Sequence, residues 1–264
     1  MEIFEFIKPK RPLLVSFPHS GTYIPPEVAE GMTELALRTP DTDWHLPRLY
    51  EFVRQSGAGL LIATHSRYVV DLNRNPSGQA LYVGADNTEL CPSTSFEHEA
   101  LYKSGEGVGD VEVRKRIERF WSPYHRTLAD TLGDMVEEFG HALLFDAHSI
   151  RARVPRFFDG SLPDLNLGTA DGASASVALE KDLMSVLESG DYSSVCNGRF
   201  KGGYITRQYG APEKSIHAVQ LEMVQDNYMN EEYPFEYRPD RALKMQQVLE
   251  PLIETALQWI ESRN

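Results

Sequence analysis

The sequence predicts an α/β protein with a mixed, mostly parallel sheet covered by helices on both faces. Two observations carry this prediction. Several short apolar runs are broken by glycine or serine, and such runs are typical of buried strands in a parallel sheet. Between them lie longer segments whose apolar residues recur every three or four positions, as in amphipathic helices. Strands that alternate with helices favour three layers, with the sheet in the middle.

Each element follows from a local pattern. The predicted strands are compact apolar runs at residues 12–17, 58–64, 67–72, 142–147 and 215–222. The predicted helices carry apolar stripes and cover residues 44–53, 117–136, 174–189 and 240–261. Pro123 is expected to kink or break the second helix. Residues 84–108 and 151–173 are polar and are expected as long loops. The second of these follows His148 and is expected to lie over the active site.

The composition limits the classes of partner. The chain has 264 residues, a formal net charge of -13 and a pI of about 5.1. Such a surface repels phosphate backbones, which argues against nucleic acid as a partner. An anionic substrate would therefore need local positive charge. No linker or internal repeat interrupts the sequence, so one domain over residues 1–264 is the simplest organisation.

The cellular location is inferred from what the sequence lacks. Cys91 and Cys196 are too few for a disulfide framework and form no CxxC pair. The acidic N-terminus has no signal-peptide layout, and no apolar stretch is long enough to span a membrane. We therefore expect a cytoplasmic protein with no membrane contact. The oligomeric state is left open by the sequence.

Two histidines stand in similar contexts. His19 and His148 each closely follow the apolar residues of a predicted strand, and open α/β sheets place their sites at the carboxyl ends of strands. We expect both imidazoles to hold one metal ion, with Asp146 able to orient a ring. Catalytic zinc usually takes three protein ligands. The third is expected from Asp41 or Asp43, and their spacing does not choose between them.

Four further side chains carry chemistry. Asn73 and Arg74 follow a predicted strand and form a fork that can grip a carboxylate or polarise a carbonyl. Glu222 ends another apolar run, where solvation explains a carboxylate poorly. In metal hydrolases such a group takes a proton from water and passes it to the leaving amine. Arg207 follows a glycine-rich segment that allows close approach of a ligand, and it would suit a second substrate carboxylate.

These residues stand in motifs that resemble those of the N-formylglutamate amidohydrolase (formylglutamate deformylase) family of histidine degradation. That family is related to zinc carboxypeptidases and aspartoacylases. The resemblance runs from near the N-terminus to about Tyr228 and depends on several motifs in order. They are Pro18-His19-Ser20-Gly21, Ser66-Arg67, Asp71-Leu72-Asn73-Arg74, Asp146-Ala147-His148-Ser149, Asn197-Gly198-Arg199-Phe200, Gly203-Tyr204-Ile205-Thr206-Arg207 and Gln220-Leu221-Glu222.

The resemblance implies a zinc-carboxypeptidase-like fold and hydrolysis of N-formyl-L-glutamate to formate and L-glutamate. It also implies one divalent ion, with zinc as the expected metal, and a small anionic N-acyl amino acid as the partner. One departure matters, because the wider superfamily uses His-x-x-Glu for its first two ligands. Thr22 stands three residues after His19, so the carboxylate must come from elsewhere. We expect Asp43 rather than Asp41 to join His19 and His148.

The implied mechanism gives each remaining residue a role. Glu222 takes the proton from water, and Arg74 helps to hold the oxyanion. Arg207 and Arg74 bind the substrate carboxylates, with Arg67 and Arg199 in reserve. The nearest alternative is another metal-dependent deacylase or carboxypeptidase acting on a different N-acyl amino acid, which substrate profiling would separate. A non-catalytic carboxylate-binding protein on the same fold is a second alternative, which a formate-release test would separate.

Overall fold

A mixed sheet of seven strands forms the centre of the computed structural model, within the residues it describes (1–80, 84, 86–105 and 107–263). In spatial order the strands are β1 (Phe4–Ile7), β3 (Gly59–Ala63), β2 (Leu13–Phe17), β4 (Ala142–Ile150), β7 (Ile216–Val224), β5 (Leu165–Gly168) and β6 (Ser194–Cys196). The neighbours β3, β2, β4 and β7 run parallel, whereas β1 and β5 pair antiparallel with this central group. The expected mixed, mostly parallel sheet is confirmed.

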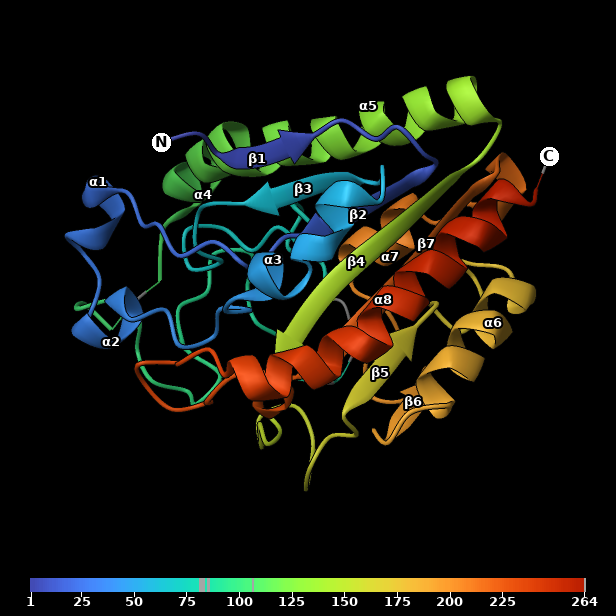
Figure 1. The fold of residues 1–264 in the computed structure, drawn as a ribbon. Helices are drawn as coiled ribbons and strands as arrows, with labels where there is room; N and C mark the ends of the chain where they lie inside the picture. The colour runs from blue at the N-terminus through green and yellow to red at the C-terminus, as the bar shows by residue number, and fades with distance from the viewer. Residues whose placement is uncertain (81–83, 85, 106, 264) are drawn as a thin grey trace.

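Helices cover both faces of the sheet (Figure 1). On one face lie α5 (Ser122–Phe139) and α7 (Tyr204–Tyr209). On the other lie α3 (Leu46–Leu49), α6 (Val177–Glu188) and α8 (Pro239–Glu261). The remaining α-helices are α1 (Pro26–Ala29), α2 (Glu34–Leu37) and α4 (Asp110–Arg116). The expected three-layer α/β class is thus the observed one.

The central strands read as continuous apolar runs because both of their faces are covered. Every residue of β2 is buried. Its successive side chains point to opposite faces, so Leu14 joins the core under α5 while Val15 joins the core under α8. Both faces of the central strands are therefore closed by packed side chains.

The order of the strands places a crevice between β2 and β4. From β2 the chain moves to β3 on one side, and it later returns to β4 on the other side. A reversal of this kind opens a crevice at the carboxyl ends of the two strands. His19 follows β2 directly, and His148 lies near the carboxyl end of β4. Both histidines therefore sit at the place where such sheets hold their ligands.

Four of the five predicted strands are confirmed, as β2, β3, β4 and β7. The strand predicted at 67–72 is wrong, because this segment forms turns. Its apolar residues, including Val69 and Leu72, pack into the core beside α5. Its backbone groups pair outside the sheet: Asp71 N–H donates to Leu90 O, and Arg116 donates to Val69 O. Residues 67–72 are buried as the residues of a central strand would be, so the segment is equally apolar although it forms no strand.

The predictions for the helices and loops had mixed outcomes. The helices at 174–189 and 240–261 are confirmed as α6 and α8, while 44–53 divides into α3 and a 3₁₀ helix, Glu51–Gln55. The stripe at 117–136 begins with a π-helical segment, Ile117–Trp121, and Pro123 lies in the first turn of α5, where its missing N–H is tolerated.

The predicted long loops contain elements that the sequence patterns missed. β5 lies inside 151–173, and β1, β6 and α7 were also missed because they are short. Of 84–108, residues 85 and 106 lie outside the described residues, and the others form turns and isolated bridges. Within the described part of the chain, no helix has both the length and the apolar character needed to cross a membrane.

Candidate active site

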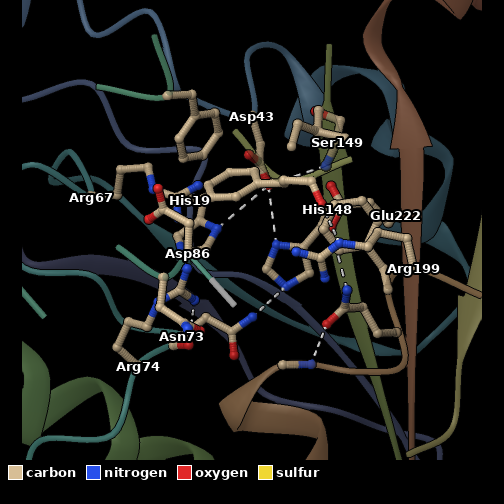
Figure 2. Close-up of a pocket in the computed structure, with 17 residues that line it drawn as sticks. His19, Asp43, Arg67, Asn73, Arg74, Asp86, His148, Ser149, Arg199 and Glu222 are labelled. Atoms are coloured by element: carbon tan, nitrogen blue, oxygen red, sulfur yellow. Dashed lines mark hydrogen bonds and ion pairs between the residues drawn. The ribbon is translucent and has the colours of Figure 1, made fainter. Parts of the chain in front are cut away.

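Three buried side chains converge at the crevice between β2 and β4. One ligand atom from each of His19, Asp43 and His148 can be chosen so that all lie within 4.8 Å of one another. Asp43 Oδ2 lies 3.8 Å from His19 Nδ1 and 3.2 Å from His148 Nδ1. The centroids of the two imidazole rings are 4.9 Å apart. Figure 2 shows both rings directed toward the Asp43 carboxylate. Two nitrogens and one oxygen are the donor set of many catalytic zinc sites.

Each imidazole is held by a carboxylate on its other nitrogen. His19 Nε2 lies 2.7 Å from Asp71 Oδ1, and His148 Nε2 lies 2.8 Å from Asp146 Oδ2. These contacts fix the ring orientations and direct both Nδ1 atoms toward Asp43. Metal-bound histidines commonly have such a carboxylate partner, which fixes the tautomer and raises the basicity of the ligand. The expected orienting role of Asp146 agrees with this geometry.

Asp41 lies apart from this group. Its Oδ2 accepts hydrogen bonds from the Tyr68 hydroxyl at 2.6 Å and from the Phe96 backbone N–H at 2.8 Å. Burial raises the pKa of Asp41, although these two donors and Arg67 oppose the rise. The geometry therefore favours Asp43 over Asp41 as the carboxylate beside the two histidines.

Glu222 stands next to His148 across the sheet. The two residues are paired in the register of β4 and β7, so their side chains lie on the same face. Gln220 Nε2 donates to Glu222 Oε2 at 3.3 Å, and Gln220 Oε1 accepts from the Gly203 N–H at 2.7 Å. Burial raises the pKa of Glu222 to about 8, with His148 opposing and Asp43 adding to the rise. This carboxyl group is thus buried, held in place and adjacent to the three converging side chains.

The electrostatics of the group favour a bound cation. Burial alone would lower the pKa of His148, but the carboxylates of Asp146 and Asp43 outweigh it and raise that pKa well above its ordinary value. Burial and the Arg67 guanidinium lower the pKa of His19 in spite of Asp71. Positive charge is therefore stabilised between His148 and its two carboxylates, and a divalent ion can take the place of that proton. The residues present fit a metal ion on both donor type and charge.

A pocket opens over this group (Figure 2). Its walls combine aromatic side chains with three arginines. The lining residues are His19, Asp43, Arg67, Asn73, Arg74, Asp86, Asn87, Phe96, His148, Ser149, Ile150, Phe157, Arg199, Phe200, Gly203, Gln220 and Glu222. The pocket therefore contains Glu222, which is expected to transfer the proton, and the three side chains expected to bind the metal. It also contains arginines suited to an anionic ligand.

Asn73 and Arg74 both line this pocket. Asn73 Nδ2 lies 3.1 Å from His148 Nε2, and Asn73 Oδ1 accepts from the Ile205 N–H at 2.8 Å. Arg74 donates to Thr88 Oγ1 at 2.7 Å. A Cβ at Gly203 would collide with the Asn73 amide, so glycine is required for this close approach.

Arg207 lies away from the pocket. It belongs to α7, is exposed, and donates to Gly202 O at 2.8 Å. It lines a separate surface hollow together with Asn75 and Tyr204. Arg199 and Arg67, the reserve cations, line the pocket instead. Arg67 is buried and donates to Asp71 Oδ2 at 2.5 Å, whereas Arg199 donates to Phe157 O at 2.6 Å and lies over the Phe200 ring.

Sequence reasoning missed the contributions of Asp71, Gln220 and Ser149. Asp71 lies in the same motif as Asn73 and pairs with His19, a role that no local spacing signals. Gln220 alternates with Glu222 along β7 and so reaches the same face. That alternation is a signal that could have identified Gln220 before the structure.

Comparisons with known proteins identify a family for this chain. A model of the N-formylglutamate amidohydrolase family matches residues 11–229. The chain is similar to the N-formylglutamate deformylase of Pseudomonas putida, with 49% identity over 259 residues that cover 98% of this chain and 97% of that protein. The N-formylglutamate deformylase of Pseudomonas aeruginosa is also 49% identical, over 99% of this chain and 98% of that protein.

Solved structures show the same fold. The N-formylglutamate amidohydrolase from Ralstonia eutropha JMP134 has a TM-score of 0.83 and 25% identity, with 98% of each chain covered. A gene product from Agrobacterium tumefaciens has a TM-score of 0.75 at 17% identity, with 99% of this chain and 97% of that chain covered. The second likeness concerns the fold alone. The matched family model and the two relatives that align along nearly their whole length show that the chain belongs to the N-formylglutamate amidohydrolase family.

Proposed function

We propose that this protein is a metal-dependent amidohydrolase that converts N-formyl-L-glutamate and water to formate and L-glutamate. The observation that carries the proposal is the convergence of His19, Asp43 and His148 beside Glu222. It occurs in a chain that is 49% identical along nearly its whole length to proteins named N-formylglutamate deformylase. The proposal includes a place in histidine degradation, a cytoplasmic location, and kinship with zinc carboxypeptidases and aspartoacylases.

In this proposal His19, Asp43 and His148 hold one divalent ion, with zinc as the expected metal. Such an ion supplies Lewis acidity, which allows water to act as a nucleophile near neutral pH. Asp71 and Asp146 keep the two imidazoles oriented with Nδ1 toward the ion site. All three ligand side chains are buried.

Glu222 moves the proton. Its carboxylate removes a proton from the attacking water as the bond between the water oxygen and the formyl carbon forms. It then delivers that proton to the amide nitrogen as the bond between carbon and nitrogen breaks, so formic acid and a neutral amine form. The acid then loses its proton to the amine, which gives formate and the ammonium form of glutamate. The pKa of Glu222, raised to about 8 in the absence of a metal ion, falls when further positive charge is added beside it. The carboxylate form needed for the first transfer is then available near neutral pH.

The arginines that line the pocket bind the substrate carboxylates. Asn73 and Arg74 suit the carboxylate next to the scissile amide, and Arg74 also helps to hold the developing oxyanion. For the side-chain carboxylate we favour Arg199 over Arg207, because Arg199 lines the pocket and Arg207 lines a different hollow. Figure 2 shows Arg74 and Arg199 on opposite sides of His148, as a substrate with two separated negative charges requires.

A formate-release assay tests the proposal. The purified protein, loaded with zinc, should release formate from N-formyl-L-glutamate at a rate well above that of the zinc-free protein. N-formyl and N-acetyl derivatives of other amino acids serve as comparison substrates. Failure to release formate from N-formyl-L-glutamate, together with turnover of another N-acyl amino acid, would replace this substrate assignment with the deacylase alternative.

A further inference from the structure

We propose that Gln225, Ser149 and Tyr228 act together as positioning residues that hold Asp43 in place to bind the metal ion. We call these three residues the Asp43 brace. The inference depends on the proposed metal site, and it extends that site to side chains that make no contact with the ion.

Asp43 needs such support because it lies on irregular backbone. It belongs to neither a helix nor a strand. The residues Thr39 and His45 on either side of it have positive φ values of 48° and 64°, a region that side chains other than glycine rarely adopt. A carboxylate three residues after the first histidine would be fixed by local geometry, but Thr22 occupies that position here. The position of the Asp43 carboxylate must therefore be fixed by tertiary contacts.

The Asp43 brace holds the backbone carbonyls of the two residues on either side of Asp43. Gln225 Nε2 donates to Thr42 O at 3.0 Å, and the Tyr228 hydroxyl donates to Trp44 O at 2.9 Å. Both carbonyls belong to residues adjacent to Asp43 in the chain. Anchoring the peptide group before Asp43 and the one after Trp44 restricts movement of the short segment that carries the Asp43 side chain.

Ser149 connects the two donors into one hydrogen-bonded chain. The Gln225 amide also reaches Ser149 Oγ at 3.4 Å, and Ser149 Oγ lies 2.7 Å from the Tyr228 hydroxyl. Because the Tyr228 hydroxyl donates its proton to Trp44 O, the Ser149 hydroxyl is the donor in the contact between them. The hydrogen bonds of the three side chains can therefore all form at once, because Ser149 accepts from Gln225 and donates to Tyr228. Each of the three side chains is buried. Satisfied buried networks of this kind rigidify their surroundings.

The same serine also contacts the ligand itself. The Ser149 backbone N–H donates to Asp43 Oδ2 at 3.2 Å, the oxygen that faces both imidazoles. Ser149 follows His148 in β4, and Gln225 follows β7, the strand that carries Glu222. The ends of two neighbouring strands therefore position a histidine ligand, the proposed proton carrier and, through the Asp43 brace, the carboxylate ligand.

Two variants break the Asp43 brace at its two ends. Tyr228→Phe removes the hydroxyl that holds Trp44 O, and Gln225→Met removes the amide that holds Thr42 O. Tyr50→Phe is the matched control. Tyr50 is buried in the same core cluster, and its hydroxyl has no hydrogen-bond partner among the described residues. The control therefore removes an equally buried hydroxyl that donates no hydrogen bond to the segment carrying Asp43.

The measured quantity is the zinc dissociation constant of the metal-free protein, obtained by competition with a chelating indicator. Loss of groups that orient metal ligands typically weakens metal binding about 10–100-fold. We expect this loss in Tyr228→Phe and in Gln225→Met, and no loss in Tyr50→Phe. The cobalt-substituted Tyr228→Phe protein should also show a changed visible absorption spectrum, since that spectrum reports ligand geometry. Turnover should recover when zinc is raised to saturation.

The zinc affinities of the variants and of the wild type decide whether the Asp43 brace positions the ligand. Normal zinc binding by both variants, with normal binding by the wild-type chain, overturns the inference and leaves the metal site intact. Absence of zinc binding by the wild-type chain overturns the metal site and the inference together. If Tyr228→Phe does not fold, as judged by circular dichroism, Gln225→Met decides alone. Because both residues act through one chain, their effects on zinc affinity should be less than additive in the double variant.

Discussion

Asp43 Oδ2 lies 3.2 Å from Nδ1 of His148, although 105 positions separate the two residues in the sequence. The contact joins an irregular loop to a central strand, at the place where the chain changes direction across the sheet. A ligand set of this kind depends on the tertiary fold, because no short motif contains both residues. Metal binding and folding are consequently expected to be coupled.

Zinc should stabilise the folded protein. Ligand that binds only the folded state at 1,000 times its dissociation constant adds about 4 kcal/mol to the free energy of unfolding. Addition of zinc to the metal-free protein should therefore raise the Tm by several degrees, and a chelator should reverse the shift. His148→Ala should abolish the zinc-induced shift. His98→Ala is the control, because His98 is exposed and outside the pocket. An equal shift in His148→Ala would remove that residue from the ligand set. Differential scanning calorimetry measures each case.

Glu222→Gln should separate catalysis from metal binding. The amide of glutamine cannot accept the proton of the attacking water, and general acid–base groups typically contribute about 10²–10⁴-fold to rate. We expect kcat to fall by roughly this factor while zinc stoichiometry, measured by atomic absorption, stays at that of the wild type. Loss of zinc from the variant would instead make Glu222 a ligand. Wild-type turnover would remove Glu222 from the mechanism.

The same substitution should change the pH dependence of stability in the metal-free protein. The folded-state pKa of Glu222 is raised from 4.5 to about 8, chiefly by burial. Between these values the folded state binds more protons than the unfolded state, so this group lowers stability as pH rises, by at most about 1.4 kcal/mol per pH unit. Relative to wild type, Glu222→Gln should gain stability from pH 5 to pH 8. Urea unfolding at several pH values measures the difference, and a constant difference would contradict the buried, protonated carboxyl.

The central strands and the two histidines could be predicted because burial and position in a strand produce local sequence patterns. Strands covered on both faces read as continuous apolar runs, as in β2 and β4, and a polar residue that ends such a run stands out. Glu222 was recognisable for the same reason. The segment 67–72 misled because its residues are equally buried, yet its peptide groups pair with loop atoms and with Arg116. An apolar pattern reports burial and does not identify the hydrogen-bond partners of the backbone.

Residues that act through long-range contacts could not be identified from a local sequence pattern. The sequence alone could not choose between Asp41 and Asp43, because both precede the same short helix. The structure separates them by their donors, which come from Tyr68 and Phe96 for Asp41 and from Ser149 for Asp43. The sequence likewise did not show which arginines line the pocket. The glycines before Arg207 suggested close approach to a ligand, but Gly203 instead allows close approach to the Asn73 side chain.

Arg199 and Arg207 provide a matched pair for the origin of substrate specificity. Arg199 lines the pocket that holds the two histidines, whereas Arg207 lies on α7 and lines another hollow. A charge-assisted hydrogen bond contributes about 1.5–3 kcal/mol, which corresponds to roughly 10–100-fold in affinity. Arg199→Gln should therefore raise KM for N-formyl-L-glutamate by roughly this factor and change kcat less. N-formyl-L-glutamine, whose side chain is neutral, should lose much less. Arg207→Gln should leave both substrates unaffected. If Arg207→Gln alone abolishes the preference for the charged side chain, the cation that selects glutamate is the one the sequence pattern first indicated, and the pocket must rearrange around substrate to reach it.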